Sequence, residues 1–341
     1  MIQFRKEIRT SVFRDPTENY ALSKREMQKR YDPLDGRMVR IFPFRGMTFP
    51  RHDWTPFVEE SRQRFCPFCP GTVEKVTPRF PADFIAEGVI SCGQALLVPN
   101  LHPYETHTGV VIMTPIHYLS MEDITVEVMT DAMEAGLNYL KVIAAQDPVN
   151  AKYSSINWNY MPYAGGSIIH PHLQIISGAE PCNLDGSMIA AAADYYQKNG
   201  RVYWHDLIAA EKSDGARYLG TTGKIEWLAS FAPLTMGDIT AVLEGCATVH
   251  DVTRQTLAEL AGGFRKVISY YDQINFPAFN MALYFTDREA AGFCCTARMV
   301  GRFTLFPLVG SDVSHMEMMH MDPCSFAEPE DMAVEARKFF K

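Results

Sequence analysis

The sequence predicts an α+β fold made of two halves of similar plan, each an antiparallel sheet with packed helices. A strand, a long helix and a pair of strands follow one another between residues 107 and 177, and the same order returns between residues 224 and 302. This order is typical of α+β architecture, and its recurrence indicates duplication even where identity between the halves is low. We therefore expect one pseudo-duplicated unit with a boundary near residue 180, between an N-terminal half (1–180) and a C-terminal half (181–341).

The opening third of the chain is expected to form loops and short strands. Pro115 ends a β-run that is rich in branched residues. Ser120 is a suitable N-cap for the helix that follows, in which apolar residues recur at helical spacing. The expected elements are strands at 36–45 and 107–115, a helix from Ser120 to about Ala145, and strands at 153–161 and 170–177 on either side of a Gly-Gly turn.

The second half repeats this plan after an insertion that reads as helical. Its strand segments are rich in β-branched and aromatic residues, and its long helix begins at a capping sequence. The expected elements are a helical region at 185–218, strands at 224–232 and 238–244, a helix at 251–273, a hairpin at 279–302 and a last helix at about 329–340.

Composition limits the class of protein. With 47% hydrophobic and 21% charged residues the chain is ordinary for a globular protein, and no apolar run reaches the roughly 18 residues of a membrane span. The net charge of -8 argues against binding to nucleic acid. The first residues contain no secretory apolar stretch, and the eight cysteines fit reduced thiols better than a disulfide framework. We expect a cytoplasmic protein that binds neither membrane nor nucleic acid.

Three polar side chains are expected on one face of the strand within residues 164–177. Because successive side chains of a strand alternate between its faces, His170, His172 and Gln174 point together while the residues between them pack against the core. A half-exposed strand with incidental histidines is the alternative interpretation. The pattern favours a functional site.

Within this site His172 is the expected nucleophile. A neutral imidazole attacks phosphorus well when its other nitrogen donates to a fixed acceptor, such as the carbonyl of a nearby strand residue. Gln174 can donate to a phosphate oxygen as negative charge builds up. Gly165 and Gly166 allow close backbone approach, and Ser167 adds a hydroxyl, although a turn residue is an equal interpretation of that serine.

A zinc site is expected at the Cys-x2-Cys pair formed by Cys66 and Cys69. A structural zinc site often joins such a pair to two histidines. His117, just beyond one predicted strand, and His170, at the start of another, are the candidates, because adjacent strands can bring both to the cysteine pair. The pair can also be read as a redox motif, but it lacks the strand-to-helix setting of one. Zinc is therefore the favoured interpretation.

The sequence resembles galactose-1-phosphate uridylyltransferases, a nucleotidyltransferase branch of the histidine triad superfamily. Five elements occur in the family's order, which is far more specific than any one motif. They are CPFC at 66–69, NLHPY at 100–104, TPIH at 114–117, Asn159 eleven residues before His170, and S-x-x-H-P-H-x-Q at 167–174. The resemblance extends weakly to both ends of the chain, at 33–45 and 227–243. It implies two histidine-triad-like halves, of which the N-terminal one is catalytic and contains the zinc site.

The resemblance also implies a mechanism and a set of site residues. His172 takes a nucleoside monophosphate, UMP in the family, from a nucleoside diphosphate sugar, releases sugar 1-phosphate and passes the nucleotide to a second sugar 1-phosphate. Zinc is structural, and a homodimer and a role in galactose metabolism are implied. The implied residues are Cys66, Cys69, His117 and His170 at the zinc, Ser167 and Gln174 at the phosphate, Asn100 and Asn159 in the nucleotide pocket, and Arg45 near the phosphates.

Two departures from the family leave alternatives open. Where family members place metal-binding histidines in the second half, this chain has FCCTARM (293–299), so no second metal is expected. The stretch at 311–326 lacks the family's lysine and glutamine for the hexose phosphate. A phosphorylase that uses inorganic phosphate, acting on a nucleoside diphosphate sugar or a dinucleoside polyphosphate, therefore stays an alternative. A non-catalytic, zinc-stabilised nucleotide-binding protein is a third, which His172 and Gln174 disfavour.

Overall fold

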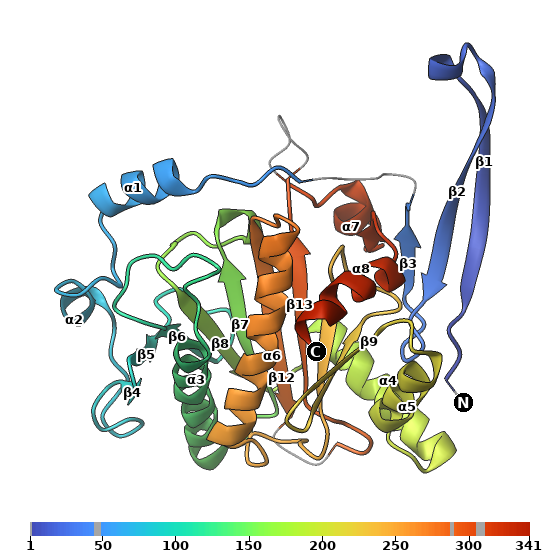
Figure 1. Ribbon diagram of the computed structural model, residues 1–341. Helices are drawn as coiled ribbons and strands as arrows, with labels where there is room; N and C mark the ends of the chain where they lie inside the picture. The colour runs from blue at the N-terminus through green and yellow to red at the C-terminus, as the bar shows by residue number, and fades with distance from the viewer. Residues whose placement is uncertain (1, 44–48, 287–289, 305–310) are drawn as a thin grey trace.

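The computed structural model describes residues 2–43, 49–286, 290–304 and 311–341 (Figure 1). Within these ranges the chain forms a ten-stranded sheet, a four-stranded sheet and eight α-helices. The predicted α+β class is confirmed. Arg45, which the sequence places near the phosphates, lies outside the described residues.

The ten-stranded sheet joins the two halves of the chain edge to edge. Its strand order is β4-β5-β6-β8-β7-β12-β13-β11-β10-β9, and neighbouring strands are antiparallel throughout. The first five strands come from the first half, the last five from the second, and β7 pairs with β12 where they meet. The strands are β4 (Ile90–Cys92), β5 (Ala95–Pro99), β6 (His107–Ile112), β7 (Tyr153–Tyr160), β8 (His172–Gly178), β9 (Tyr218–Thr222), β10 (Ile225–Ala229), β11 (Ile239–Leu243), β12 (Ala278–Thr286) and β13 (Thr296–Arg302). The predicted pseudo-duplication is visible in this mirrored order, whereas the domain boundary near residue 180 stays a prediction.

Two long helices, α3 (Val126–Gln146) and α6 (Arg254–Gln273), cover one face of this sheet side by side (Figure 1). The main core lies between them and the strands. Helix α3 packs closely on the sheet at Gly136, where a Cβ would lie 2.7 Å from Cδ1 of Ile175 on β8. That contact shows that the alternate residues of β8 face the helices, as the sequence pattern predicts.

Helix α3 begins later than the sequence predicts. Thr125 is its N-cap, with Oγ1 accepting from the amide of Val128. The hydroxyl of Ser120, the predicted N-cap, instead donates to the carboxylate of Asp123 at 2.6 Å in a separate turn. Ser120 is therefore a turn residue, and its preference for capping is satisfied locally.

The opposite face of the sheet is covered differently in the two halves. In the second half, α5 (Tyr203–Asp214) packs Tyr203, Trp204 and Leu207 against residues of β10 and β11, and α4 (Asn183–Asn199) precedes it. The predicted helical region at 185–218 is thus two helices and the start of β9. In the first half the same face packs against Phe68 and its neighbours in the loop that contains Cys66. His172 and Gln174 lie on this face.

The four-stranded sheet contains a hairpin that the sequence did not reveal. It consists of β1 (Lys6–Asp15), β2 (Ala21–Tyr31), β3 (Met38–Ile41) and the parallel β14 (Cys324–Ser325). Strands β1 and β2 stand away from the body of the molecule (Figure 1). Arg30, fully buried at the base of β2, anchors them through ion pairs with Glu328 and Glu330. The expectation of loops and short strands was wrong for this segment.

The remaining helices are short. They are α1 (Thr55–Gln63), α2 (Val73–Val76), α7 (His315–His320) and α8 (Pro329–Ala336), with single 3-10 turns at Pro16–Glu18, Pro162–Ala164 and Arg337–Phe339. Helix α1 crosses one end of the sheet and leads into the Cys66 loop (Figure 1). Across the described ranges, every helix is too short or too polar to span a bilayer.

Candidate metal centre and catalytic strand

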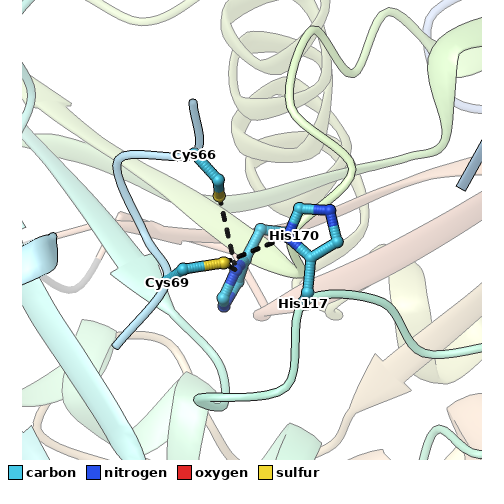
Figure 2. Close-up of side chains that lie close together, drawn as sticks. All are labelled: Cys66, Cys69, His117 and His170. Atoms are coloured by element: carbon cyan, nitrogen blue, oxygen red, sulfur yellow. Dashed lines mark hydrogen bonds between the residues drawn. The ribbon is translucent and has the colours of Figure 1, made fainter. Parts of the chain in front are cut away.

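Four side chains from three separate segments converge at one point (Figure 2). The ligand atoms of Cys66, Cys69, His117 and His170 all lie within 4.8 Å of one another. Sγ of Cys69 is 3.1 Å from Nδ1 of His117 and 3.6 Å from Nδ1 of His170, and Sγ of Cys66 is 3.7 Å from the latter. Tetrahedral zinc with ordinary bond lengths separates sulfur from nitrogen by about 3.6 Å. The four residues can therefore hold a metal ion of this kind.

The partners of the two histidines select the nitrogen that faces the thiols. Nε2 of His170 donates to the carbonyl of Thr114 at 2.7 Å, because a carbonyl only accepts. The hydroxyl of Ser61 uses its proton on the carbonyl of Val58, so it accepts from Nε2 of His117 at 3.0 Å. Both Nδ1 atoms therefore present a lone pair to the cluster, as metal-bound histidines with fixed outer nitrogens do.

The cysteine loop is fixed by its own hydrogen bonds. The hydroxyl of Thr72 lies 2.7 Å from the carbonyls of both Cys66 and Cys69. Burial and the neighbouring Cys66 raise the pKa of the Cys69 thiol to about 11, and burial lowers the pKa of His170 to about 4. A cation bound here would favour the thiolate over the thiol. Neutral imidazoles beside two thiols are a donor set that suits zinc.

His172 is the first residue of β8 and is oriented by its own chain. Its Nδ1 donates to the carbonyl of His170 at 2.8 Å, which leaves the lone pair on Nε2. Burial lowers the pKa of the imidazole, so the ring is neutral in neutral solution. The side chain is 7% exposed, and the Phe68 ring lies 5.4 Å from it. The arrangement matches the expected tautomer of a nitrogen nucleophile.

A row of polar side chains crosses the strands beside His172. Asn157 on β7 pairs with Gln174 on β8, so continuing the register brings Asn159 level with His172. Residues that are level on neighbouring antiparallel strands project from the same face. Gly166 must be a glycine, because a Cβ there would lie 2.9 Å from the carbonyl oxygen of Asn159.

The other predicted site residues, Gly165, Ser167 and Asn100, lie outside this row. Gly165 has a φ of +88°, which favours glycine, and it precedes the loop that returns to β8. Ser167 is exposed and lines a cavity of about 120 Å³ beside Cys66 and His117, whereas His172 does not line it. Asn100 follows β5, where its Oδ1 accepts from the amide of His102.

Asn100 lies well away from His172. Extending the pairing of β5, β6 and β8 places it level with Ile176, four residues along β8 from His172. At ordinary strand spacings the two are separated by about 16 Å. Such a span requires an extended ligand.

Two residues of the second half belong to the same surface and were not found from the sequence. Asn280 on β12 is paired with Asn159, and its Nδ2 lies 2.7 Å from Oδ1 of that residue. Arg302 at the end of β13 donates to Oδ1 of Asn280 at 2.9 Å. No local signal marks these residues, because the pairing of β7 with β12 joins segments 121 positions apart.

Comparisons with known proteins agree with this architecture. No family model matches the chain. An uncharacterized protein of Archaeoglobus fulgidus is 29% identical over 340 residues, which covers 99% of each chain. Among solved structures, an ADP-glucose phosphorylase from Arabidopsis thaliana with bound ADP-glucose has a TM-score of 0.71 at 18% identity, covering 92% of this chain and 99% of that one.

Two further structures show the same likeness. A GalT-like protein from Arabidopsis thaliana has a TM-score of 0.70 at 19% identity over 91% of this chain and 98% of that one. A uridylyltransferase has a TM-score of 0.67 at 16% identity over 92% and 98%. Identities this low establish the fold alone. The chain therefore has the fold of these GalT-like and uridylyltransferase structures, as its sequence motifs predicted.

Proposed function

We propose that this protein is a nucleotidyltransferase that moves a nucleoside monophosphate from a nucleoside diphosphate sugar to a phosphate acceptor through a covalent nucleotidyl-His172. The observation that carries the proposal is the hydrogen bond from Nδ1 of His172 to the carbonyl of His170. It fixes a neutral ring with its lone pair on Nε2, beside a row of amide side chains. This is the form of histidine that attacks phosphorus.

The reaction runs in two displacements. Nε2 of His172 attacks the α-phosphorus, a nitrogen–phosphorus bond forms, and the bond to the bridging oxygen breaks with release of sugar 1-phosphate. The positive charge that develops on the ring is stabilised by the His170 carbonyl. An oxygen of the acceptor phosphate then attacks the same phosphorus, and the nitrogen–phosphorus bond breaks. His172 returns to its neutral form.

The neighbouring groups bind and orient the phosphates in this proposal. The carboxamide of Gln174 has no hydrogen-bond partner among the described residues, so it is available as a donor to an α-phosphate oxygen. Gly165 and Gly166 let the backbone approach the ligand, and Ser167 supplies a hydroxyl. Asn159 contributes its amide from β7, and Asn100 binds the distal part of the nucleotide. Arg45 is a proposed phosphate ligand, and only the family resemblance supports this role.

Zinc is the proposed metal at Cys66, Cys69, His117 and His170. When bound it would neutralise two thiolates and link the cysteine loop to the segment that follows β6 and the segment that precedes β8. His170 connects this centre to the chemistry, because its ring faces the cluster and its carbonyl orients His172. The absence of a second metal site stays a prediction.

Two phosphate acceptors for the nucleotide are proposed, and a separate observation supports each. The ordered motifs resemble uridylyltransferases, which supports UMP as the transferred group and a sugar 1-phosphate as the acceptor. The similar ADP-glucose phosphorylase structure supports inorganic phosphate as the acceptor. A role in galactose metabolism and a cytoplasmic location stay predictions, as does the lack of a nucleic-acid or membrane partner.

A donor and acceptor screen tests this proposal. Zinc-loaded protein is incubated with UDP-glucose, ADP-glucose or GDP-glucose that contains radioactive glucose, each with galactose 1-phosphate, glucose 1-phosphate or inorganic phosphate, and released radioactive glucose 1-phosphate is measured. We expect turnover with at least one pair, and the acceptor that supports it identifies the reaction. Binding of nucleotide without release of sugar 1-phosphate in every combination would favour the non-catalytic alternative.

We also propose that the protein is a homodimer, with the β1–β2 hairpin as part of the contact. Residues 1–31 contain eight Lys and Arg and four Asp and Glu, so they carry +4 against -12 for the rest of the chain. Val12 and Leu22 on this hairpin are 53% and 63% exposed. The net negative charge of the rest of the chain would attract this basic segment of a second copy. Sedimentation should show a dimer that the double substitution of Val12→Glu and Leu22→Glu weakens, and a monomeric wild type would contradict this.

A further inference from the structure

Asn159, Asn280 and Arg302 form a chain of hydrogen bonds that runs from the second half of the molecule into the proposed nucleotide site. Asn280 on β12 is directly opposite Asn159 on β7, and the other neighbour of β7 is β8, which contains His172. Nδ2 of Asn280 lies 2.7 Å from Oδ1 of Asn159 and 2.8 Å from the carbonyl oxygen of Ala164. The second half therefore reaches the site through Asn159.

The donor and acceptor of each hydrogen bond follow from chemistry. They do not depend on which atom of each carboxamide is drawn as oxygen and which as nitrogen. An arginine side chain only donates, so the Asn280 atom 2.9 Å from Nη1 of Arg302 must be the acceptor oxygen. The other end of the same amide is then Nδ2, and its two protons go to Ala164 and Asn159. The Asn159 atom that receives one of them must also be oxygen. The Nδ2 of Asn159 is thus left as the group that points away from Asn280.

Arg302 itself is held firmly in place. Nε of Arg302 lies 2.8 Å from Oδ2 of Asp312, and Nη2 lies 2.6 Å from Oδ1, which is a bidentate pair. The Asp312 side chain is 2% exposed and the Arg302 side chain 18%, so water screens the pair little. Every amide orientation from Asp312 to Asn159 is therefore determined.

We propose that Asn280 and Arg302 are positioning residues that hold Asn159 with its N–H groups toward the bound nucleotide. The ligand group at Asn159 is then an acceptor, and because Asn159 is level with the attacking His172 it is a phosphate oxygen of the transferred nucleotide. A hydrogen-bond donor of the ligand is disfavoured at this point. This inference rests on the proposed function and names a role for residues in the half of the molecule that does not contain His172.

The substitution Asn280→Asp tests the polarity of the chain. The new carboxylate still accepts from Arg302 but cannot donate, so the Asn159 amide turns over to donate to it and presents oxygen to the nucleotide. A lost donor and a repulsion between oxygens should weaken binding of the donor substrate about 10-fold to 100-fold. The milder substitution Asn280→Ala leaves the Asn159 amide unconstrained, and a smaller loss is expected.

A double-mutant cycle separates positioning from general damage. The dissociation constant of the nucleotide sugar that is active in the screen is measured, in a His172→Asn background that prevents turnover, for Asn280→Asp, Asn159→Ala and the two combined. We expect Asn280→Asp to weaken binding in the presence of Asn159 and to have less than about a twofold effect once Asn159 is alanine. A merely structural role, including the lost bond to Ala164, would weaken binding equally in both backgrounds, and that result would overturn the inference.

The same cycle with Asn280→Ala keeps the test valid if the aspartate variant does not fold. Equal weakening in both backgrounds, or no weakening in either, would again contradict the inference. If the wild-type protein turns over a nucleotide sugar and the effects of the two substitutions on binding are additive, only the positioning role is refuted. A wild-type protein that neither binds nor turns over any nucleotide sugar refutes this inference and the proposed function together.

Discussion

The carbonyl oxygen of His170 accepts a hydrogen bond from Nδ1 of His172 at 2.8 Å, two residues further along the same chain. The ring of His170 meanwhile faces Cys66 and Cys69 through its own Nδ1. One residue thus joins the candidate metal centre to the proposed nucleophile. The backbone between them is short, so ordering the His170 ring also orders the acceptor that fixes the His172 tautomer.

The hydroxyl of Ser61 should matter for metal affinity, because it is the group that holds Nε2 of His117. The substitution Ser61→Ala should weaken zinc binding about 10-fold to 100-fold while leaving the four ligands unchanged. Competition with a chromophoric chelator measures this. Ser11→Ala, on the exposed face of β1, is the control and should have no effect. An unchanged zinc affinity in Ser61→Ala would show that the hydrogen bond does not support the site.

Removing zinc should lower stability, since the metal closes a loop between Cys66 and His170 and its binding energy is folding energy. Chelation, or Cys69→Ser, should lower Tm by several degrees. Cys182→Ser is the matched control, because Cys182 is an exposed free thiol outside the cluster. A melting temperature that stays the same after verified zinc removal would contradict a structural role for the metal.

Gln174→Ala should slow the chemical step. If its carboxamide donates to the phosphate only as charge builds up, kcat should fall about 100-fold with a much smaller change in KM. Gln197→Ala, at an exposed position of α4, provides the control. A rise in KM at unchanged kcat would instead assign Gln174 to ground-state binding.

The buried ion-pair network at the base of the hairpin predicts a pH dependence of stability. Burial acts to raise the pKa of Glu330, but the hydrogen bond and charge of Arg30, with a further hydrogen bond from Arg217, lower it to about 2 from an ordinary 4.5. A carboxyl whose pKa is lowered by folding stabilises the folded state at pH values above its pKa in the unfolded chain. This stabilisation is lost as pH falls from about 4.5 toward 2. The full effect is about 3 kcal/mol.

The variant Glu330→Gln tests this linkage. The difference in unfolding free energy between wild type and variant should be largest near pH 6 and should shrink steadily toward pH 3, as measured by urea denaturation. Titration of groups that do not interact with Glu330 is common to both proteins and cancels in the difference. Glu335→Gln removes an exposed partner of Lys338 and should show little pH-dependent difference. A difference that grows as pH falls would mean that the sign of the linkage is wrong.

The face of β8 was readable from the sequence because one physical constraint determines it. Leu173 and Ile175 are apolar and face α3, so the residues that alternate with them must face the other way. The convergence of the four candidate metal ligands was equally accessible, because cysteine and histidine at such spacings have few alternative uses. Short-range patterns therefore predicted the central part of the candidate site.

Other features could not be predicted because distant segments determine them. The β1–β2 hairpin has charged residues on both faces, so no alternation of apolar and polar residues marks its strands. Asn280 joins the site only because β12 pairs with β7, and a sequence does not specify which edges meet. Ser120 resembled a helix cap because it caps a turn with Asp123 by the same chemistry.

The covalent role of His172 is tested most directly by labelling the protein with a nucleotide sugar that contains radioactive phosphorus at the α position. The zinc-loaded protein should acquire an acid-labile, base-stable label on one residue, found on His172 by peptide mapping. The label should be absent in His172→Asn and unchanged in His205→Asn, whose side chain is 53% exposed on α5. No label from uridine, adenine or guanine donors, or a label that persists in His172→Asn, would contradict the account.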